Sequence, residues 1–204
     1  MKKRYLLLVS ALCLTFQAFG QSGKFFIGGD VGFSTTSYSN KGTGYPKSQY
    51  DFSLQPSIGY YLSDKLAIGT GLGFSVYGNT YNTNPQVTDA TTNFSITPFV
   101  RYALIEVNNF SFIGQGSLGV GFGGSGSSTG GTTTTGPSTF NFNFGISPGF
   151  QYKLNDKISL ETFFGDIGLK YNSTTPKTGS KTSNTNFNFS LGSGLSLGFI
   201  YFLN

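Results

Sequence analysis

Histidine and tryptophan are absent from this chain of 204 residues, and only 10% of its residues carry a charge. Without histidine, the chain lacks the most frequent general base and the commonest metal ligand of proteins. Because Cys13 is the single cysteine, the chain cannot form an internal disulfide bond to stabilise its fold. Beyond residue 20, no run approaches the roughly 18 consecutive apolar residues of a membrane-spanning helix, so the sequence excludes a helical membrane protein.

The N-terminus has the features of a secretory signal peptide. A basic segment, Lys2 to Arg4, precedes a mostly apolar segment and the small-residue pattern Ala18-Phe19-Gly20. We therefore expect cleavage between Gly20 and Gln21, with a signal peptide at 1–20 and one domain at 21–204. Cleavage leaves ten basic and eight acidic residues, a net charge of +2, so no nucleic-acid partner is expected.

Three stretches of the remaining chain are almost alike: FSLQPSIGYYL from Phe52, FSITPFVRYAL from Phe94 and FGISPGFQYKL from Phe144. In each, bulky apolar residues alternate with small or polar ones, which is the period of a β-strand. A small barrel has no room for the bulky set inside, because about eight strands enclose a lumen that side chains only just fill. Facing outward, the bulky set forms an apolar belt around a narrow polar interior, as in a transmembrane barrel.

The same alternation predicts eight strands. Their approximate ranges are 24–35, 49–62, 65–77, 91–104, 110–123, 138–153, 157–171 and 185–202. Tight turns alternate with long, polar connections, which is typical of outer-membrane barrels with short periplasmic turns and long extracellular loops. The expected fold is therefore all-β: an eight-stranded antiparallel up-and-down transmembrane β-barrel with both termini on the periplasmic side.

These features resemble the small, porin-like outer-membrane β-barrel domain family of Gram-negative bacteria, broadly OmpA- and OmpX-like. The resemblance rests on the signal peptide, the repeated proline- and tyrosine-containing hairpins and the final strand LGSGLSLGFIYF. It implies location in the outer membrane and insertion by the outer-membrane assembly machinery, which reads an aromatic final strand. Phe199, Tyr201 and Phe202 supply aromatics there, although the chain ends in Leu203-Asn204 and not in an aromatic residue.

Two irregularities in the strands are expected. Pro56, Pro98 and Pro148 each remove one ladder hydrogen bond, so we expect a bulge or a widened pair beside each. In the seventh strand, Phe164 and Ile167 cannot both face outward without an inserted residue, which predicts a bulge at Gly165-Asp166.

Tyr60, Tyr102, Tyr152 and Tyr201 end their strands beside the tight turns or the C-terminus. Tyrosine has an apolar body and a polar tip, so these four residues are expected to form the periplasmic aromatic girdle. Their predicted role is anchoring and not ligand binding.

No catalytic, cofactor or metal site is expected. The barrel enzymes of the outer membrane use a histidine as base or partner, and this chain has none. The inward acidic residues Asp30, Asp51 and Glu161 are expected to lie far apart along the barrel axis, which disfavours a carboxylate dyad. The absence of clustered carboxylates at calcium-loop spacing argues against a metal site.

Arg101 and Glu161 point inward at a similar predicted depth, where a charge needs a partner. We expect them to pair. One interpretation is an ion pair that fills and stiffens a plugged barrel, and the other is a gate across a narrow water path. The remaining polar lumen residues are expected to be Asp30, Asp51, Gln55, Gln115 and Gln151, with Phe99 and Phe163 also pointing inward.

The long loops are rich in Thr, Ser, Asn and Gly, and their main charges are Lys41, Lys47, Lys177 and Lys181. They are interpreted as solvated surface, or as a surface that meets anionic lipopolysaccharide or an unidentified partner.

Two functions remain open for an expected monomer surrounded by outer-membrane lipid. One is a structural or surface-interaction role in envelope integrity or adhesion, with the lumen largely filled. The other is a small porin or channel for ions, small solutes or small apolar molecules. A soluble lipocalin-like binder is disfavoured because the apolar set lies on the wrong face.

Overall fold

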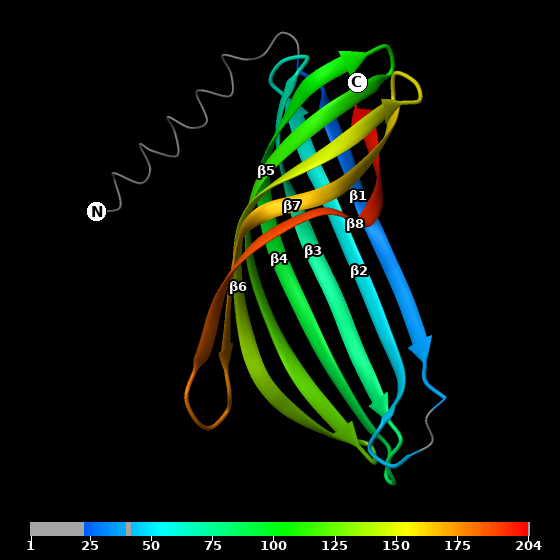
Figure 1. Cartoon of the computed structure of the whole chain (residues 1–204), viewed down its shortest axis with the longest axis vertical. Coiled ribbons are helices and arrows are strands. Elements are labelled where there is room, and N and C mark those ends of the chain that lie inside the picture. Colours follow the sequence, from blue (N-terminus) through cyan, green and yellow to red (C-terminus); the bar gives the residue numbers. More distant parts are fainter. Residues whose placement is uncertain (1–22, 40–41, 204) are drawn as a thin grey trace, which may run out of the picture.

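The computed structural model describes residues 23–39 and 42–203. The predicted signal peptide, its cleavage site at Gly20 and Gln21, and Lys41 lie outside these residues. The chain forms eight antiparallel strands in a closed ring, each paired with its neighbours in sequence (Figure 1). The strands are β1 (Phe25–Ser37), β2 (Pro46–Tyr61), β3 (Leu66–Tyr81), β4 (Val87–Val107), β5 (Phe110–Thr129), β6 (Thr132–Lys153), β7 (Ile158–Thr175) and β8 (Thr182–Leu203).

The all-β ring of eight strands agrees with the prediction from the sequence alternation. Three tight turns, at 62–65, 108–109 and 154–157, lie at the same end of the barrel as the C-terminal end of β8. We call this end the turn end. The opposite end, where the other connections lie, is the hairpin end. No helix among the described residues has the length and apolar character needed to cross a membrane.

The long polar loops predicted from the sequence are shorter than expected, because the strands continue into them. The predicted loop at 124–137 is a hairpin in which β5 and β6 pair up to Thr129 and Thr132. Gly130 and Gly131 form its turn with φ of 56° and 87°, as a two-residue type I′ turn requires. β-branched threonines such as Thr132 to Thr135 favour the extended backbone, which explains the continuation.

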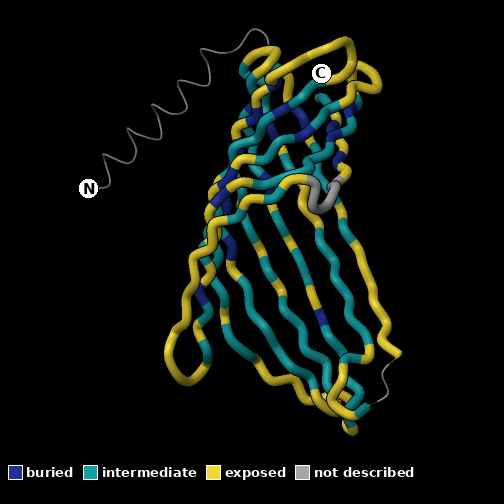
Figure 2. The backbone as a smooth tube through the Cα atoms, viewed as in Figure 1, coloured by how far each residue is buried: buried dark blue, intermediate teal, exposed yellow. Residues whose placement is uncertain are grey.

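The bulky set faces outward and the small set faces the lumen, as the alternation predicts. Phe33 and Phe187 are among the most exposed apolar side chains, at 72% and 69%. The buried residues gather toward the turn end, at the top of Figure 2. The lumen is therefore filled at one end and more open toward the other.

Each of the three strand prolines lies beside an interruption of the ladder. Pairing of β2 with β3 stops at Leu54 and resumes at Ser57, and pairing of β4 with β5 stops at Ile96 and resumes at Phe99. Beside Pro148 the register between β6 and β7 shifts between Ile146 and Gly149. Proline has no N–H to donate, so pairing is lost on one side of each proline and kept on the other.

The bulge expected in β7 is also present. In the β6–β7 ladder, Ile146 pairs with Ile167 and Gly149 pairs with Phe163, so β7 carries one residue more than β6 within 164–166, at the predicted position. The register between β7 and β8 also shifts, between Phe163 and Gly165, and there the extra residues lie on β8. Beyond this point β7 and β8 bend away from β1, as Figure 1 shows. Within the part of the chain that the structure describes, the ring closes between β1 and β8 through five residue pairs, from Phe25 with Leu203 to Gly29 with Phe199.

Candidate functional site in the barrel lumen

Toward the turn end, Arg101 of β4 meets Glu161 of β7 across the lumen. Arg101 Nη1 lies 2.6 Å from Glu161 Oε2, and the two side chains are only 5% and 9% exposed. The ion pair predicted between these two residues is therefore present. Their strands are far apart around the ring, so the pair ties opposite walls of the barrel together.

Gln115 of β5, directly opposite Arg101 in the β4–β5 register, holds the guanidinium from one side. Arg101 Nε and Nη2 both donate to Gln115 Oε1, at 3.1 and 2.7 Å. Neither Arg101 Nη1 nor Glu161 Oε2 makes a well-aligned hydrogen bond within the described residues. The contact with Glu161 is therefore mainly an attraction between two charges in a buried place, where removal of either charge is costly.

Three aromatic rings surround the same guanidinium. Arg101 Cζ lies 5.4 Å from the ring centre of Phe99, 5.5 Å from that of Phe163 and 5.8 Å from that of Phe26. These distances lie within the roughly 6 Å range of cation–π attraction. The arginine is thus fixed by an ion pair, an amide and three rings at once.

An apolar layer fills the lumen around this arginine. Phe26, Ala67, Phe99 and Ile200 are buried together, and Tyr61 and Phe202 pack against them. The Tyr61 hydroxyl donates to Gln151 Oε1 at 3.3 Å. We call this layer, together with Arg101 and Glu161, the plug.

The sequence analysis did not single out Phe26 and Tyr61, or assign Phe202 to the lumen. Each is a bulky residue on the inward set of its strand, where small residues otherwise dominate, and each lies within a few residues of the turn end. That break in the alternation is the signal that would have found them.

The plug separates two cavities. The cavity at the turn end has a volume of about 320 Å³ and is lined by residues that include Tyr61, Arg101 and Gln151. The cavity on the hairpin side has a volume of about 500 Å³ and is lined by residues that include Gln55, Arg101 and Gln115. Arg101 lines both, so it stands at the point where a path along the lumen is closed.

Exposed charges surround the turn-end cavity. Lys153 and Asp156 both line it and form an ion pair at 2.9 Å. The hydrogen bond from Lys153 holds the pKa of the Asp156 carboxyl below its usual range. Such exposed pairs contribute little to stability, so they shape the mouth of the cavity and do not carry the fold.

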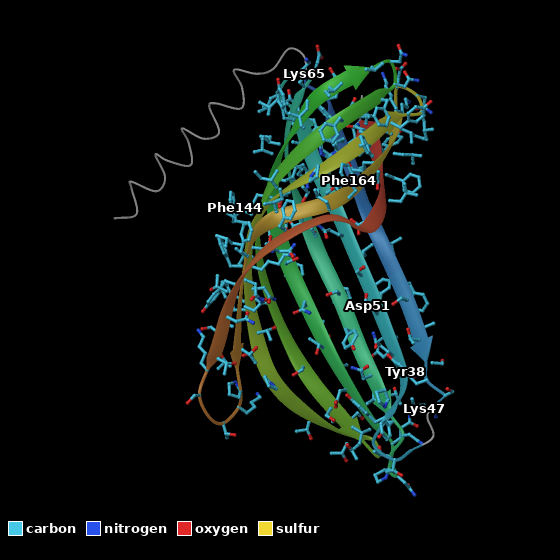
Figure 3. The ribbon with its side chains drawn as sticks, in the orientation of Figure 1. Tyr38, Lys47, Asp51, Lys65, Phe144 and Phe164 are labelled. Atoms are coloured by element: carbon cyan, nitrogen blue, oxygen red, sulfur yellow. The ribbon has the colours of Figure 1, made fainter. Side chains whose placement is uncertain are left out.

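The inward acidic residues are not all far apart, contrary to the expectation from the strand ranges. Asp30 and Glu161 line the same cavity, because the closing strands bring β1 close to β7 at this level. Asp51 lies farther toward the hairpin end, opposite Ser34 and Tyr77. Figure 3 places it between Lys65 at the turn end and Lys47 at the hairpin end. No group of three or more potential metal ligands occurs in the described part of the chain.

The four tyrosines predicted as an aromatic girdle belong to the outward set near the turn end. Tyr102, Tyr152 and Tyr201 are exposed, and the Tyr60 ring packs on Phe25 with ring centres 4.7 Å apart. Tyr201 pairs with Ile27 and Ile158 on either side. Their position suits anchoring at a membrane boundary, which remains a prediction.

Replacement of Gly69 by alanine should destabilise the plug. An added Cβ would overlap the ring of Phe99 and lie 2.6 Å from the Ile58 carbonyl oxygen. We expect Gly69→Ala to lower the free energy of unfolding by about 1–3 kcal/mol, as overpacking does. Denaturant unfolding of the refolded protein measures the change.

Gly116→Ala is the matched control for this substitution, because its Cβ would face outward with its nearest neighbour 4.0 Å away. Equal stability of the Gly69→Ala and Gly116→Ala variants would contradict tight packing of the plug.

A closed antiparallel ring with an apolar exterior and a polar, partly plugged lumen defines a small membrane β-barrel. Residues 5–194 match the protein family described as outer membrane protein beta-barrel domain. The chain therefore belongs to the outer membrane protein β-barrel domain family.

Solved structures of outer-membrane proteins are similar to this chain at low sequence identity. A major outer membrane protein from Thermus thermophilus is 14% identical, with a TM-score of 0.53, over 90% of this chain and 100% of that chain. Neisserial surface protein A is 15% identical, with a TM-score of 0.44, over 89% and 99% of the two chains. Ail, the attachment invasion locus protein of Yersinia pestis, is 14% identical, with a TM-score of 0.44, over 90% and 99%. No curated protein matches this chain by sequence.

Proposed function

We propose that this outer-membrane barrel is non-conducting and has a structural or surface-interaction role, in envelope integrity or adhesion. The observation that carries the proposal is the plug. A buried ion pair, three aromatic rings and an apolar layer occupy the lumen between the two cavities. A barrel closed in this way presents its hairpin end and its outer surface to the surroundings and offers no open path for solutes.

The alternative function is a small channel gated by Arg101 and Glu161. Its support is that Arg101 lines both cavities, so a movement of that one side chain would begin to connect them. The buried layer of Phe26, Ala67, Phe99 and Ile200 opposes it, because this layer has to move as well. We therefore favour the closed barrel.

Single-channel recording in a planar lipid bilayer tests the proposal. The refolded protein is expected to insert without producing discrete conductance steps, because the plug leaves no continuous water path. Insertion is verified separately by protease protection and by the mobility shift of the folded barrel in electrophoresis. A reconstituted general porin serves as the positive control, and discrete steps from the wild-type protein would overturn the proposal.

The hairpin end is the proposed surface for contact with lipopolysaccharide. Lys47, Lys177 and Lys181 lie in or near its connections and are exposed. Long-range attraction from such lysines to anionic headgroups would weaken with salt. We propose a monomer that is inserted by the outer-membrane assembly machinery.

A further inference from the structure

The closing seam between β1 and β8 is much shorter than the other strand pairings. β1 pairs with β2 at thirteen positions but with β8 at five, which end at Gly29 and Phe199. Beyond Gly29, β1 continues to Ser37 with no β8 partner among the described residues. In a hydrocarbon environment, an unpaired strand edge is tolerated only where it lines a cavity or is covered.

A groove lies on the outer surface at the point where the two strands part. It has a volume of about 680 Å³, and its walls are mostly apolar. They include Ile27, Val31, Leu54, Leu197 and Phe199. This volume falls in the roughly 300–1,000 Å³ range of small-molecule pockets. Because its walls belong to the outward set, the groove opens toward the lipid.

The groove meets the hairpin-side lumen cavity through three shared residues. Gly29, Asp30 and Ser57 line both spaces. Gly29 has a φ of +143°, and a side chain there would overlap the Gln55 carbonyl oxygen, so only glycine fits without strain. The junction is therefore built from small residues and one carboxylate.

The charges that line the lumen cavity do not balance. Arg101 pairs with Glu161, and Lys170 pairs with Asp166 at 3.1 Å. Asp30 is the fifth charged residue of this cavity, and no ion pair or hydrogen bond of its carboxylate is found within the described residues. The carboxylate of Asp30 is thus the one charge of this cavity without an opposite charge beside it among the described residues, and Asp30 lies where the polar cavity meets the apolar groove.

We propose that this junction binds a single-chain amphiphile with a primary ammonium head, which enters from the bilayer between β1 and β8. The ammonium pairs with Asp30, and the hydrocarbon chain lies in the groove along Val31, Leu54 and Leu197. An anionic head would add repulsion to the unpaired carboxylate, and the second chain of a diacyl lipid would stay in the bilayer without adding contacts in the groove. The plug keeps the head on the hairpin side, so the site binds and does not transport.

Photolabelling of the refolded mature chain in phosphatidylcholine vesicles tests this site. The probe is dodecylamine with a diazirine near the end of its chain, and adducts are mapped by mass spectrometry. We expect adducts concentrated on Val31, Leu54 and Leu197, and competition by unlabelled dodecylamine but not by dodecanoate. Asp30→Asn should lower the adduct yield about tenfold, because it removes the charge-assisted hydrogen bond to the head.

Asp51→Asn is the matched control, because it removes another lumen-facing carboxylate away from the junction, and its yield should equal that of the wild type. Adducts spread over the whole apolar belt would overturn the proposal, as would an Asp30→Asn variant labelled as strongly as the wild type. Equal, Asp30-dependent labelling by a photoreactive phosphatidylethanolamine would overturn the assignment to a single-chain ligand. None of these outcomes depends on conductance, so the test is independent of the proposed function.

Discussion

The double variant Phe26→Ala/Phe99→Ala should turn a silent barrel into one with discrete conductance steps. Both rings are buried in the plug, at 1% and 7% exposure, and both lie against Arg101. Their removal takes away the bulk that separates the cavities of about 320 and 500 Å³. Water that enters the gap would also solvate Arg101 and Glu161 and weaken their attraction.

The matched control is Phe74→Ala/Phe94→Ala. These two phenylalanines face each other on β3 and β4 and point outward, so the variant loses the same atoms without touching the lumen. It should stay silent in a planar bilayer. Steps of equal size from both variants would show that conductance arises from a generally loosened barrel, and a silent Phe26→Ala/Phe99→Ala variant that is demonstrably inserted would mean that further residues close the lumen.

Much of this architecture could be predicted because alternate side chains of a strand face opposite sides of the sheet, so lipid-facing and lumen-facing residues alternate along the sequence. The repeated stretches from Phe52, Phe94 and Phe144 specified which face is apolar, and the tight turns specified where strands end. The strand ranges alone placed Arg101 and Glu161 at the same depth along the barrel axis, and in the structure the two residues form an ion pair. Depth along the axis follows from counting residues from a turn, so it is accessible to sequence reasoning.

Properties that depend on how the ring closes were not predicted. The short β1–β8 seam depends on the register between the first and last strands, and no local pattern encodes it. For the same reason, Asp30 was expected far from Glu161, although both line one cavity. The hairpin extensions were missed because Thr and Ser suit both solvated loops and strands.

The ion pair should show strong coupling in a double-mutant cycle. Glu161→Met alone leaves Arg101 buried without its counter-charge, and Arg101→Met alone leaves Glu161 in the same state. Each single variant is expected to lower the free energy of unfolding by about 3–5 kcal/mol. The double variant Arg101→Met/Glu161→Met should lose far less than the sum, because two apolar side chains suit a site lined by Phe26 and Phe99.

Denaturant unfolding in lipid vesicles, followed by circular dichroism because the chain has no tryptophan, measures all four corners of the cycle. The exposed pair Lys153 and Asp156 supplies the control cycle, and its coupling should be far smaller than that of the buried pair. If the buried pair couples no more strongly than this exposed pair, water reaches Arg101 and Glu161, and the lumen is not sealed at their level. A large coupling together with a silent bilayer would mean that the same contact both stabilises the barrel and keeps it closed.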